Sequence, residues 1–321
     1  MRNFTAAFAL VFALAPVAAP AQEYPAKPIR MVVPFAPGGT SDIIGRTLGQ
    51  KLSEAWKQPV VMDNRVGVAG SIGAAVTAKA PPDGYNLLVG NVGPVAVNNS
   101  IYKSTGYDPL KDFTPITLAV TAPQIVVVHP SVPAKTFREF TALVKAHKGK
   151  ITFGSSGPGS ISHLSGELYK RMTKTDMLHV PYKASAFITT ALLGGEIDVV
   201  FSDMAVVLPH VQAGRLRALA VTSLKPTPLV PGLPSVAESG VPGFNMTSWW
   251  GVLGPAGIQQ PIVTRLNTEL GRILRLPDVQ KSFTNLGVDA TTSTAEEFGS
   301  LIKSEVTKYT KLIGELGIEK Q

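Results

Sequence analysis

The sequence contains no cysteine among its 321 residues. That absence excludes a disulfide-stapled scaffold, thiolate metal sites and cysteine catalysis. Charged residues make up only 16% of the chain, and the formal net charge of +8 is spread without any run of lysine and arginine. Such diffuse basicity is not typical of a nucleic-acid-binding surface, so we expect no nucleic-acid partner.

Long hydrophobic runs are scarce beyond the N-terminus. Arg2 precedes the apolar stretch FTAAFALVFALAPVAA, and Ala19 and Ala21 fit the small-x-small pattern of a signal peptidase site. The stretch is short and broken by proline, and no later segment approaches the roughly 18 to 20 apolar residues of a membrane-spanning helix. We therefore expect residues 1–21 to be a signal peptide, cleaved near Ala21-Gln22, and the rest to be exported without an anchor. The alternative is a buried N-terminal helix.

The chain also lacks the lysine that a nucleotide-binding phosphate loop needs. MVVPFAPGGTSDIIGR (31–46) has the pattern of a strand, a glycine turn and a helix, and ITFGSSGPGSISHLSG (151–166) repeats it. Neither segment fits the Walker pattern, and no G-x-G-x-x-G follows the first strand. A helix start nevertheless leaves N–H groups unpaired and carries positive partial charge, so it can bind an anion such as a carboxylate. The alternative for each turn is a tight turn without a ligand.

Short apolar runs alternate with amphipathic segments along the rest of the chain. We expect strands at 28–35, 58–64, 84–91, 122–130, 177–182, 196–203, 215–223 and 249–257. We expect helices at 70–80, 135–148 and 185–193, a proline-rich loop at 225–244, and two helices at the end. This alternation predicts an α/β fold of two lobes, each a mostly parallel sheet flanked by helices, with a ligand cleft between them. Lobe 1 would comprise 22–122 and 224–321, and lobe 2 would comprise 123–223.

A hydrolase would have to combine Ser155 or Ser160 with His163 and an aspartate. GSSGPGS is not the G-x-S-x-G elbow, and a serine three residues before a histidine on one helix is poorly placed for a triad. We therefore expect no enzyme, no catalytic residue, no metal and no cofactor.

Several segments occur in the order typical of one protein family, among them AKAPPDGYNLL (78–88), YDPLKDFTPI (107–116), GSSGPGSISHLSGEL (154–168) and LLGGEIDVVFSD (192–203). Along essentially its whole mature length the chain resembles the Bug family, the tripartite tricarboxylate transporter receptors. The resemblance implies a type II periplasmic-binding fold that closes on a small carboxylate in the periplasm. It also implies delivery to a two-subunit membrane permease, and for such a shuttle we expect a monomer.

The resemblance also implies that one carboxylate is held between the two glycine turns, partly through ordered waters. Carried over by position, the first turn supplies Phe35, Pro37, Gly38, Gly39, Thr40, Ser41 and Asp42. The second turn supplies Ser155, Ser156, Gly157, Gly159, Ser160 and His163.

Two further candidates follow strands. Asn91 is placed to donate to a second carboxylate, and Asp203 to accept a ligand hydroxyl or amine. The alternatives are a purely structural role for Asn91, an ion pair or cap for Asp203, a dipole stabiliser for Asp42 and a polar helix residue for His163.

Four residues depart from the family pattern. Val66 and Ala69 stand where a proline and a glycine are usual, Ala184 replaces a glycine, and Phe187 replaces a small residue. These changes make the pocket more apolar and favour an aromatic or longer aliphatic acid over a small amino acid. We expect the ligand to be a di- or tricarboxylic acid, with aromatic acids included. An exported sensor for a membrane receptor kinase would use the same pocket, and the sequence does not distinguish it from a transport receptor.

Overall fold

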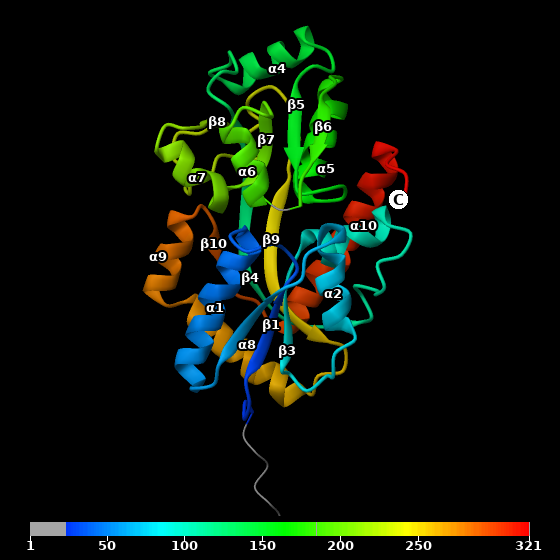
Figure 1. Cartoon of the computed structure of the whole chain (residues 1–321), viewed down its shortest axis with the longest axis vertical. Helices are drawn as coiled ribbons and strands as arrows, with labels where there is room; N and C mark the ends of the chain where they lie inside the picture. Colours follow the sequence, from blue (N-terminus) through cyan, green and yellow to red (C-terminus); the bar gives the residue numbers. More distant parts are fainter. Residues whose placement is uncertain (1–23, 184, 321) are drawn as a thin grey trace, which may run out of the picture.

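The structure is a computed structural model that describes residues 24–183 and 185–320. The expected signal peptide with its cleavage point, and Ala184, lie outside these ranges. Figure 1 shows an elongated molecule of two lobes joined by two long strands. These strands are β4 (Phe113–Val128) and β9 (Thr247–Pro255). Because β4 belongs to both sheets, the lobes share backbone hydrogen bonding and are not separated by a flexible linker.

The lower lobe in Figure 1 contains the strand order β2-β1-β3-β9-β4. Its strands besides the long pair are β1 (Ile29–Val33), β2 (Val60–Asn64), β3 (Asn86–Asn91) and β10 (Asp289–Ala290). Its helices are α1 (Thr40–Trp56), α2 (Ser71–Ala78), α3 (Asn98–Ile101), α8 (Gln260–Leu274), α9 (Pro277–Asn285) and α10 (Ala295–Leu316), with short helical turns η1 (Val68–Gly70) and η2 (Gly93–Val97).

The upper lobe continues the sheet as β4-β7-β5-β6, with β8 also paired to β4. Its strands are β5 (Thr152–Ser155), β6 (Leu178–Pro181), β7 (Val199–Asp203) and β8 (Arg217–Val221). Its helices are α4 (Phe137–Ala146), α5 (Ile161–Thr173), α6 (Ser185–Leu193) and α7 (Met204–Gln212).

The two-lobed α/β architecture is confirmed, but parallel pairing is confined to the outer strands. β1 pairs in parallel with β2 and β3, and β5 with β6 and β7. The long strands run antiparallel to their neighbours β3, β7 and β8, so each sheet is mixed. Since each long strand crosses from one lobe into the other, it enters one of the sheets against the direction of the outer strands.

Three helical segments were not expected. The first spans η2 and α3, where an initial Gly-Pro suggests only a turn. The second is α7, which follows β7 without any intervening turn residue. The third arises because three helices, not two, follow β9. For the first two the sequence gives no clear boundary between neighbouring elements. For the third it does, because Pro277 begins α9 and a Thr294/Glu297 capping box begins α10.

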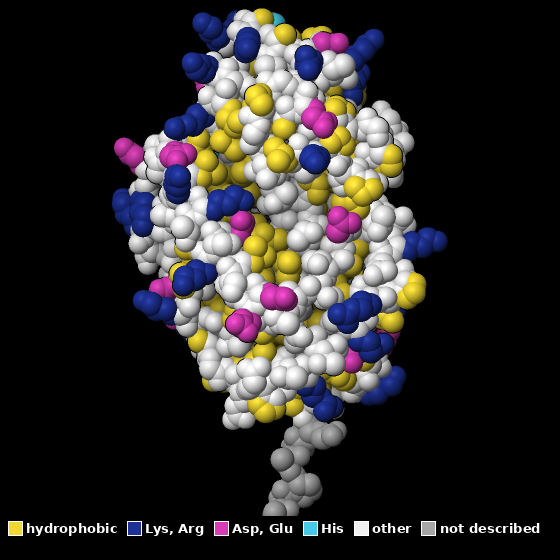
Figure 2. All heavy atoms as spheres, turned by 180° about the vertical axis from the view of Figure 1, so that it is seen from behind, with side chains coloured by type: hydrophobic (Ala, Val, Ile, Leu, Met, Phe, Trp, Pro, Cys, Tyr) yellow, Lys and Arg dark blue, Asp and Glu magenta, His cyan; other side chains and the backbone are white. Residues whose placement is uncertain are grey.

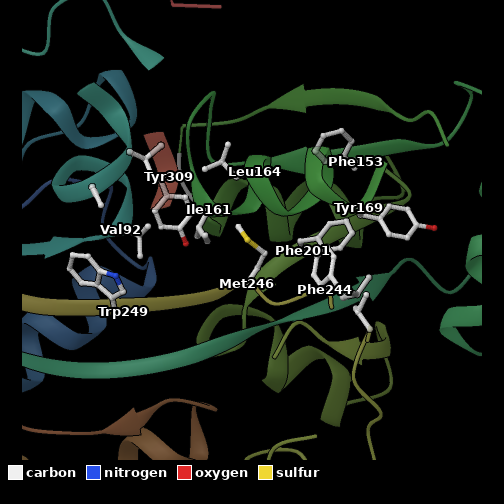
Figure 3. Packing of buried hydrophobic residues seen from close by; sticks show 14 of the residues in the cluster. Val92, Phe153, Ile161, Leu164, Tyr169, Phe201, Phe244, Met246, Trp249 and Tyr309 are labelled. Atoms are coloured by element: carbon white, nitrogen blue, oxygen red, sulfur yellow. The ribbon is translucent and has the colours of Figure 1, made fainter. Parts of the chain in front are cut away.

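One hydrophobic cluster extends through the waist from lobe to lobe. Figure 3 shows Trp249 towards one end and Phe153 and Tyr169 towards the other, with Ile161 and Leu164 of α5 between them. These side chains are all buried. Burial of large apolar side chains is the main favourable term in folding, so this cluster holds the start of α5 firmly against the crossing strands.

The proline-rich loop packs on the upper lobe. Val230 and Leu233 contact the cluster around Ile125 of β4, and Arg138 of α4 donates to the Glu238 carbonyl. The expected boundary between residues 223 and 224 would assign this loop to the other lobe. We propose that the chain passes from the lower to the upper lobe at 122/123. It returns to the lower lobe near Met246, just before β9.

Candidate ligand-binding site

The first glycine turn leads directly into α1. Gly39 is the N-cap of this helix and offers no side-chain acceptor, so no side chain caps the helix start. Gly39 has φ −82°, which any residue can adopt, and a Cβ there would lie 3.6 Å from its nearest neighbour, the Ala36 carbonyl oxygen. The start of α1 is therefore an uncapped, positively polarised end with space beside it.

Asp42 organises this turn from behind. Its carboxylate accepts hydrogen bonds from the Gly38 N–H at 3.0 Å, from Arg46 Nε at 2.8 Å and from Asn64 Nδ2 at 3.0 Å. Burial by itself raises the pKa of Asp42, but these hydrogen bonds outweigh it and hold the pKa below its usual value. The ionised Asp42 thus stabilises the loop through hydrogen bonds and does not line the cavity.

The hydroxyls of the first turn reach across the molecule. Thr40 Oγ1 donates to Asp203 Oδ2 at 3.2 Å, which joins α1 to the end of β7 in the other lobe. Trp250 Nε1 of β9 donates to Ser41 Oγ at 3.0 Å. Ser248 of the same strand donates to Asp203 Oδ1 at 3.2 Å. The start of α1, a crossing strand and the upper lobe therefore meet at Asp203.

Serines of the second glycine turn and of the first turn of α5 hold the start of this helix. Ser160 is the N-cap of α5, where its Oγ accepts from the His163 N–H at 3.3 Å and donates to the Gly157 carbonyl at 2.7 Å. Ser162 Oγ accepts from the Ser156 N–H at 3.1 Å. Because these groups already have partners, α5 offers a ligand fewer free donors than α1.

A pair of histidines, His163 buried and His179 half-buried, supports the second turn. The Gly159 N–H donates to His163 Nδ1 at 3.2 Å, and the Gly157 N–H donates to Ser155 Oγ at 3.1 Å. His163 packs against His179 with ring centroids 4.3 Å apart. Burial, helped by nearby positive charge, lowers the pKa of each histidine to about 4. Both rings are therefore neutral at pH 7, and His163 can accept the glycine N–H.

These elements surround a narrow cavity of about 30 Å³ between the lobes. Asp203 is the one charged side chain among the described residues that line it. The expected site residues that line the cavity are Phe35, Gly39, Thr40, Ser41, Asn91, Ser156, Ser160 and Asp203. The expected residues that do not line it are Pro37, Gly38, Asp42, Ser155, Gly157, Gly159 and His163.

The cavity also has lining residues that the sequence analysis missed. They are Ala69, Gly93, Gln124, Ile161, Ser162, Ile188, Val200, Phe201 and Ser202. Gln124 could have been found, since it is the one amide in the apolar run APQIVVV. It is buried, accepts from Ser165 Oγ and donates to the Phe201 carbonyl. The apolar lining residues carry no comparable signal, because their patterns are those of any buried strand or helix.

On the face shown in Figure 2, lysine and arginine side chains are scattered over both lobes and form no single patch. Hydrophobic side chains are visible at the waist between the lobes in the same view. No helix in the described part of the chain is both long enough and apolar enough to span a membrane.

Comparison with known proteins identifies relatives of this architecture. A family model described as "Tripartite tricarboxylate transporter family receptor" matches residues 44–318. Protein BugT of Bordetella pertussis is 34% identical in an alignment covering 99% of this chain and 98% of BugT.

Two solved structures share the whole fold. The R. palustris protein Rpa4515, solved with adipate, has a TM-score of 0.91 at 33% identity, covering 93% of this chain and 100% of Rpa4515. The periplasmic binding protein BugD has a TM-score of 0.88 at 33% identity and the same coverage. These matches span both lobes and both glycine turns. The chain therefore belongs to the tripartite tricarboxylate transporter receptors, the Bug family of periplasmic solute-binding proteins.

Proposed function

We propose that this receptor captures a small carboxylate in the cavity between its lobes. The observation that carries the proposal is the uncapped start of α1 at the cavity. Beside it lies Ser41, whose Oγ accepts from Trp250 and keeps its hydroxyl hydrogen to donate. Backbone N–H groups at a helix start and neighbouring hydroxyls are suited to a small, singly charged anion. The adipate in Rpa4515 supports the same ligand class.

The rest of the proposal concerns the route of the ligand. The receptor is exported by its N-terminal signal peptide, cleaved near Ala21-Gln22, and acts in the periplasm as a monomer. It binds its ligand without converting it and delivers it to a two-subunit membrane permease. The family match supports this route, since the matched description is that of a transporter receptor.

A thermal-shift screen tests the ligand class. Purified mature chain is heated with mono-, di- and tricarboxylates and with the neutral amide of each acid. At least one acid should raise the midpoint of unfolding, and its amide should not, because the amide lacks the charge that the helix start stabilises. Equal shifts for acid and amide would contradict the proposal. So would the appearance of a chemical product during incubation.

A further inference from the structure

A second, larger hollow adjoins the cavity on the outside. Its volume is about 690 Å³, and it shares two lining residues with the inner cavity, Ala69 and Ser156. Ala69 belongs to the loop before α2 in one lobe, and Ser156 to the turn before α5 in the other. The boundary between inner cavity and outer hollow is thus the seam between the lobes, which widens when the lobes separate.

The outer hollow gathers exposed apolar side chains. Phe187 is 50% exposed, Val68 is 46% exposed and Val66 is 38% exposed, and all three line it together with the ring of Tyr182. Large apolar side chains on a protein surface are ordinary when scattered, but a converging group marks a binding surface.

The loop that carries two of these side chains is strained. Val68 and Ala69 have φ values of +47° and +48°, a region that is costly for residues with a Cβ and especially for a β-branched one. Asn98, which is fully buried, holds this conformation by donating from Nδ2 to the Ala69 carbonyl at 3.0 Å and to Ser71 Oγ at 2.8 Å. The fold therefore maintains a strained backbone that keeps Val68 exposed in the outer hollow.

In the described part of the chain, the inner cavity and the outer hollow have few cationic side chains that could pair with a ligand carrying several carboxylates. In the described residues that line the inner cavity there is one carboxylate, Asp203, and no lysine, arginine or histidine. Each carboxylate enclosed there lies in the same cavity as this like charge, with no cationic side chain among the described lining residues, so one carboxylate is less unfavourable than two. Among the described residues that line the outer hollow, the one cation is Lys183, which is exposed and therefore a weak partner for an anion.

We propose that the ligand is a monocarboxylic acid with an alkyl or aryl tail. This inference rests on the carboxylate site proposed above. The carboxylate lies in the inner cavity at the start of α1. The tail passes between Ala69 and Ser156 along the seam, and its far end covers Val66, Val68 and Phe187 in the outer hollow. Closure of the lobes then places the tail between them.

Titration calorimetry with straight-chain acids from propanoate to octanoate tests this assignment. The dissociation constant should fall about two- to fourfold for each added methylene until the outer hollow is filled. Hexanoate should bind more tightly than adipate, which has the same chain length and a second carboxylate. A flat series, or tighter binding of adipate, would overturn the inference. Failure of every acid to bind would instead overturn the proposed carboxylate site.

Substitutions in the outer hollow test whether the tail of the ligand lies there. Phe187→Ala should reduce the ratio of octanoate to propanoate affinity several-fold, whereas the control Leu110→Ala, which removes a side chain of similar exposure (49%) outside the hollow, should leave that ratio unchanged. Val68→Gly should also reduce the ratio without lowering thermal stability, because glycine accepts a positive φ. An unchanged ratio in both Phe187→Ala and Val68→Gly would overturn the inference.

Discussion

Asp203 places a negative charge in a cavity that we propose for an anion. Its oxygens already accept from Thr40 and Ser248, so Asp203 helps to join the lobes whatever it does to the ligand. An acid that carries no hydroxyl or amine gains nothing from it. Two like charges about 4 Å apart cost about 1 kcal/mol even at the dielectric constant of water.

We therefore expect Asp203→Asn to tighten hexanoate binding about fivefold or more, since it removes the like charge. The amide oxygen can still accept from one of the two hydroxyls, and the amide NH2 group can donate to the other. Titration calorimetry measures the change. Asp278→Asn is the control, because it alters the net charge equally at an exposed site far from the cavity. Weaker binding by Asp203→Asn would show that this carboxylate accepts a hydrogen bond from the ligand.

The neutral histidine pair makes stability depend on pH. His163 and His179 have pKa values of about 4 in the fold and about 6.5 when unfolded, so the unfolded chain binds more protons between these values. The free energy of unfolding should consequently fall as the pH drops from about 6.5 to 4. Below about 4 this contribution levels off.

Thermal unfolding of the wild type and of His163→Gln across pH 4 to 7 tests this dependence. The variant should lose stability less steeply, because glutamine can accept the Gly159 N–H without titrating. His147→Gln, at an exposed site, is the control and should follow the wild-type curve. If the stability of the wild type and of His163→Gln fell equally steeply with decreasing pH, His163 would not contribute to the pH dependence.

At the scale of elements, the two helix starts have different roles. α1 begins without a side-chain cap, and α5 begins with Ser160 as its cap. A carboxylate introduced at the first position should therefore imitate a ligand. We expect Gly39→Asp to raise the midpoint of thermal unfolding slightly, since aspartate is a favoured N-cap.

The same variant should reduce carboxylate affinity at least a hundredfold in titration calorimetry, because its own carboxylate occupies the helix start. Gly39→Ala adds only a methyl group in a site with room for it and is the matched control. Undiminished binding by Gly39→Asp would place the ligand away from α1.

The cap of α5 can be separated from ligand binding. Ser160→Ala should lower the free energy of unfolding by about 1 kcal/mol, and it should weaken carboxylate binding because the turn beside the cavity loosens. Thr136→Ala removes the N-cap of α4 in the same lobe, so it should cost similar stability and leave binding intact. Urea denaturation and calorimetry together distinguish the two. Equal effects of both variants on binding would mean that Ser160 acts through general stability.

How far the sequence predicts the fold can be seen from β4. Its last residues, IVVV, form an unmistakable buried strand within the expected range 122–130, whereas the part before residue 122, which contains Pro115, was not expected to be extended. The register with β9 shifts next to Pro115, and proline is tolerated in strands at such irregularities. The sequence does not reveal the shift, because the partner strand lies more than a hundred residues away.

The candidate site shows the same limit. Both glycine turns contribute lining residues to the cavity, but only part of each turn does so. The residues are Phe35, Gly39, Thr40 and Ser41 from the first turn and Ser156 and Ser160 from the second. A residue of either turn can point into the cavity or towards the residues packed behind the turn. Which of the two it does depends on packing by segments distant in the sequence. His163 faces His179, and Ser155 faces the Gly157 N–H, so both lie behind the turn. No local pattern distinguishes these orientations.

For the whole molecule, a few interlobe hydrogen bonds favour the closed arrangement. Tyr102 of the lower lobe donates its hydroxyl to the Pro158 carbonyl of the upper lobe at 2.8 Å. Removing such a bond should weaken closure by about 0.5 to 1.5 kcal/mol, which corresponds to roughly a two- to twelvefold loss of ligand affinity. We expect Tyr102→Phe to show this loss.

The control for Tyr102→Phe is Tyr24→Phe. Tyr24 makes an equivalent bond of 2.7 Å to the Gly84 carbonyl within the lower lobe. Solution scattering with saturating ligand should show a larger radius of gyration for Tyr102→Phe and no change for Tyr24→Phe. Equal behaviour of the two variants would mean that the Tyr102 bond does not contribute to closure.

The strand β4 has a consequence for how such receptors diversify. Since its 16 residues are shared by both sheets, a cut at the waist divides one strand and leaves two incomplete halves. Neither lobe is then a separable module, and recombination between relatives succeeds only when both crossings are exchanged in matching register. New specificities in this architecture should therefore arise by substitution in the loops around the seam, as at residues 66–69 and 187, and seldom by shuffling of whole lobes.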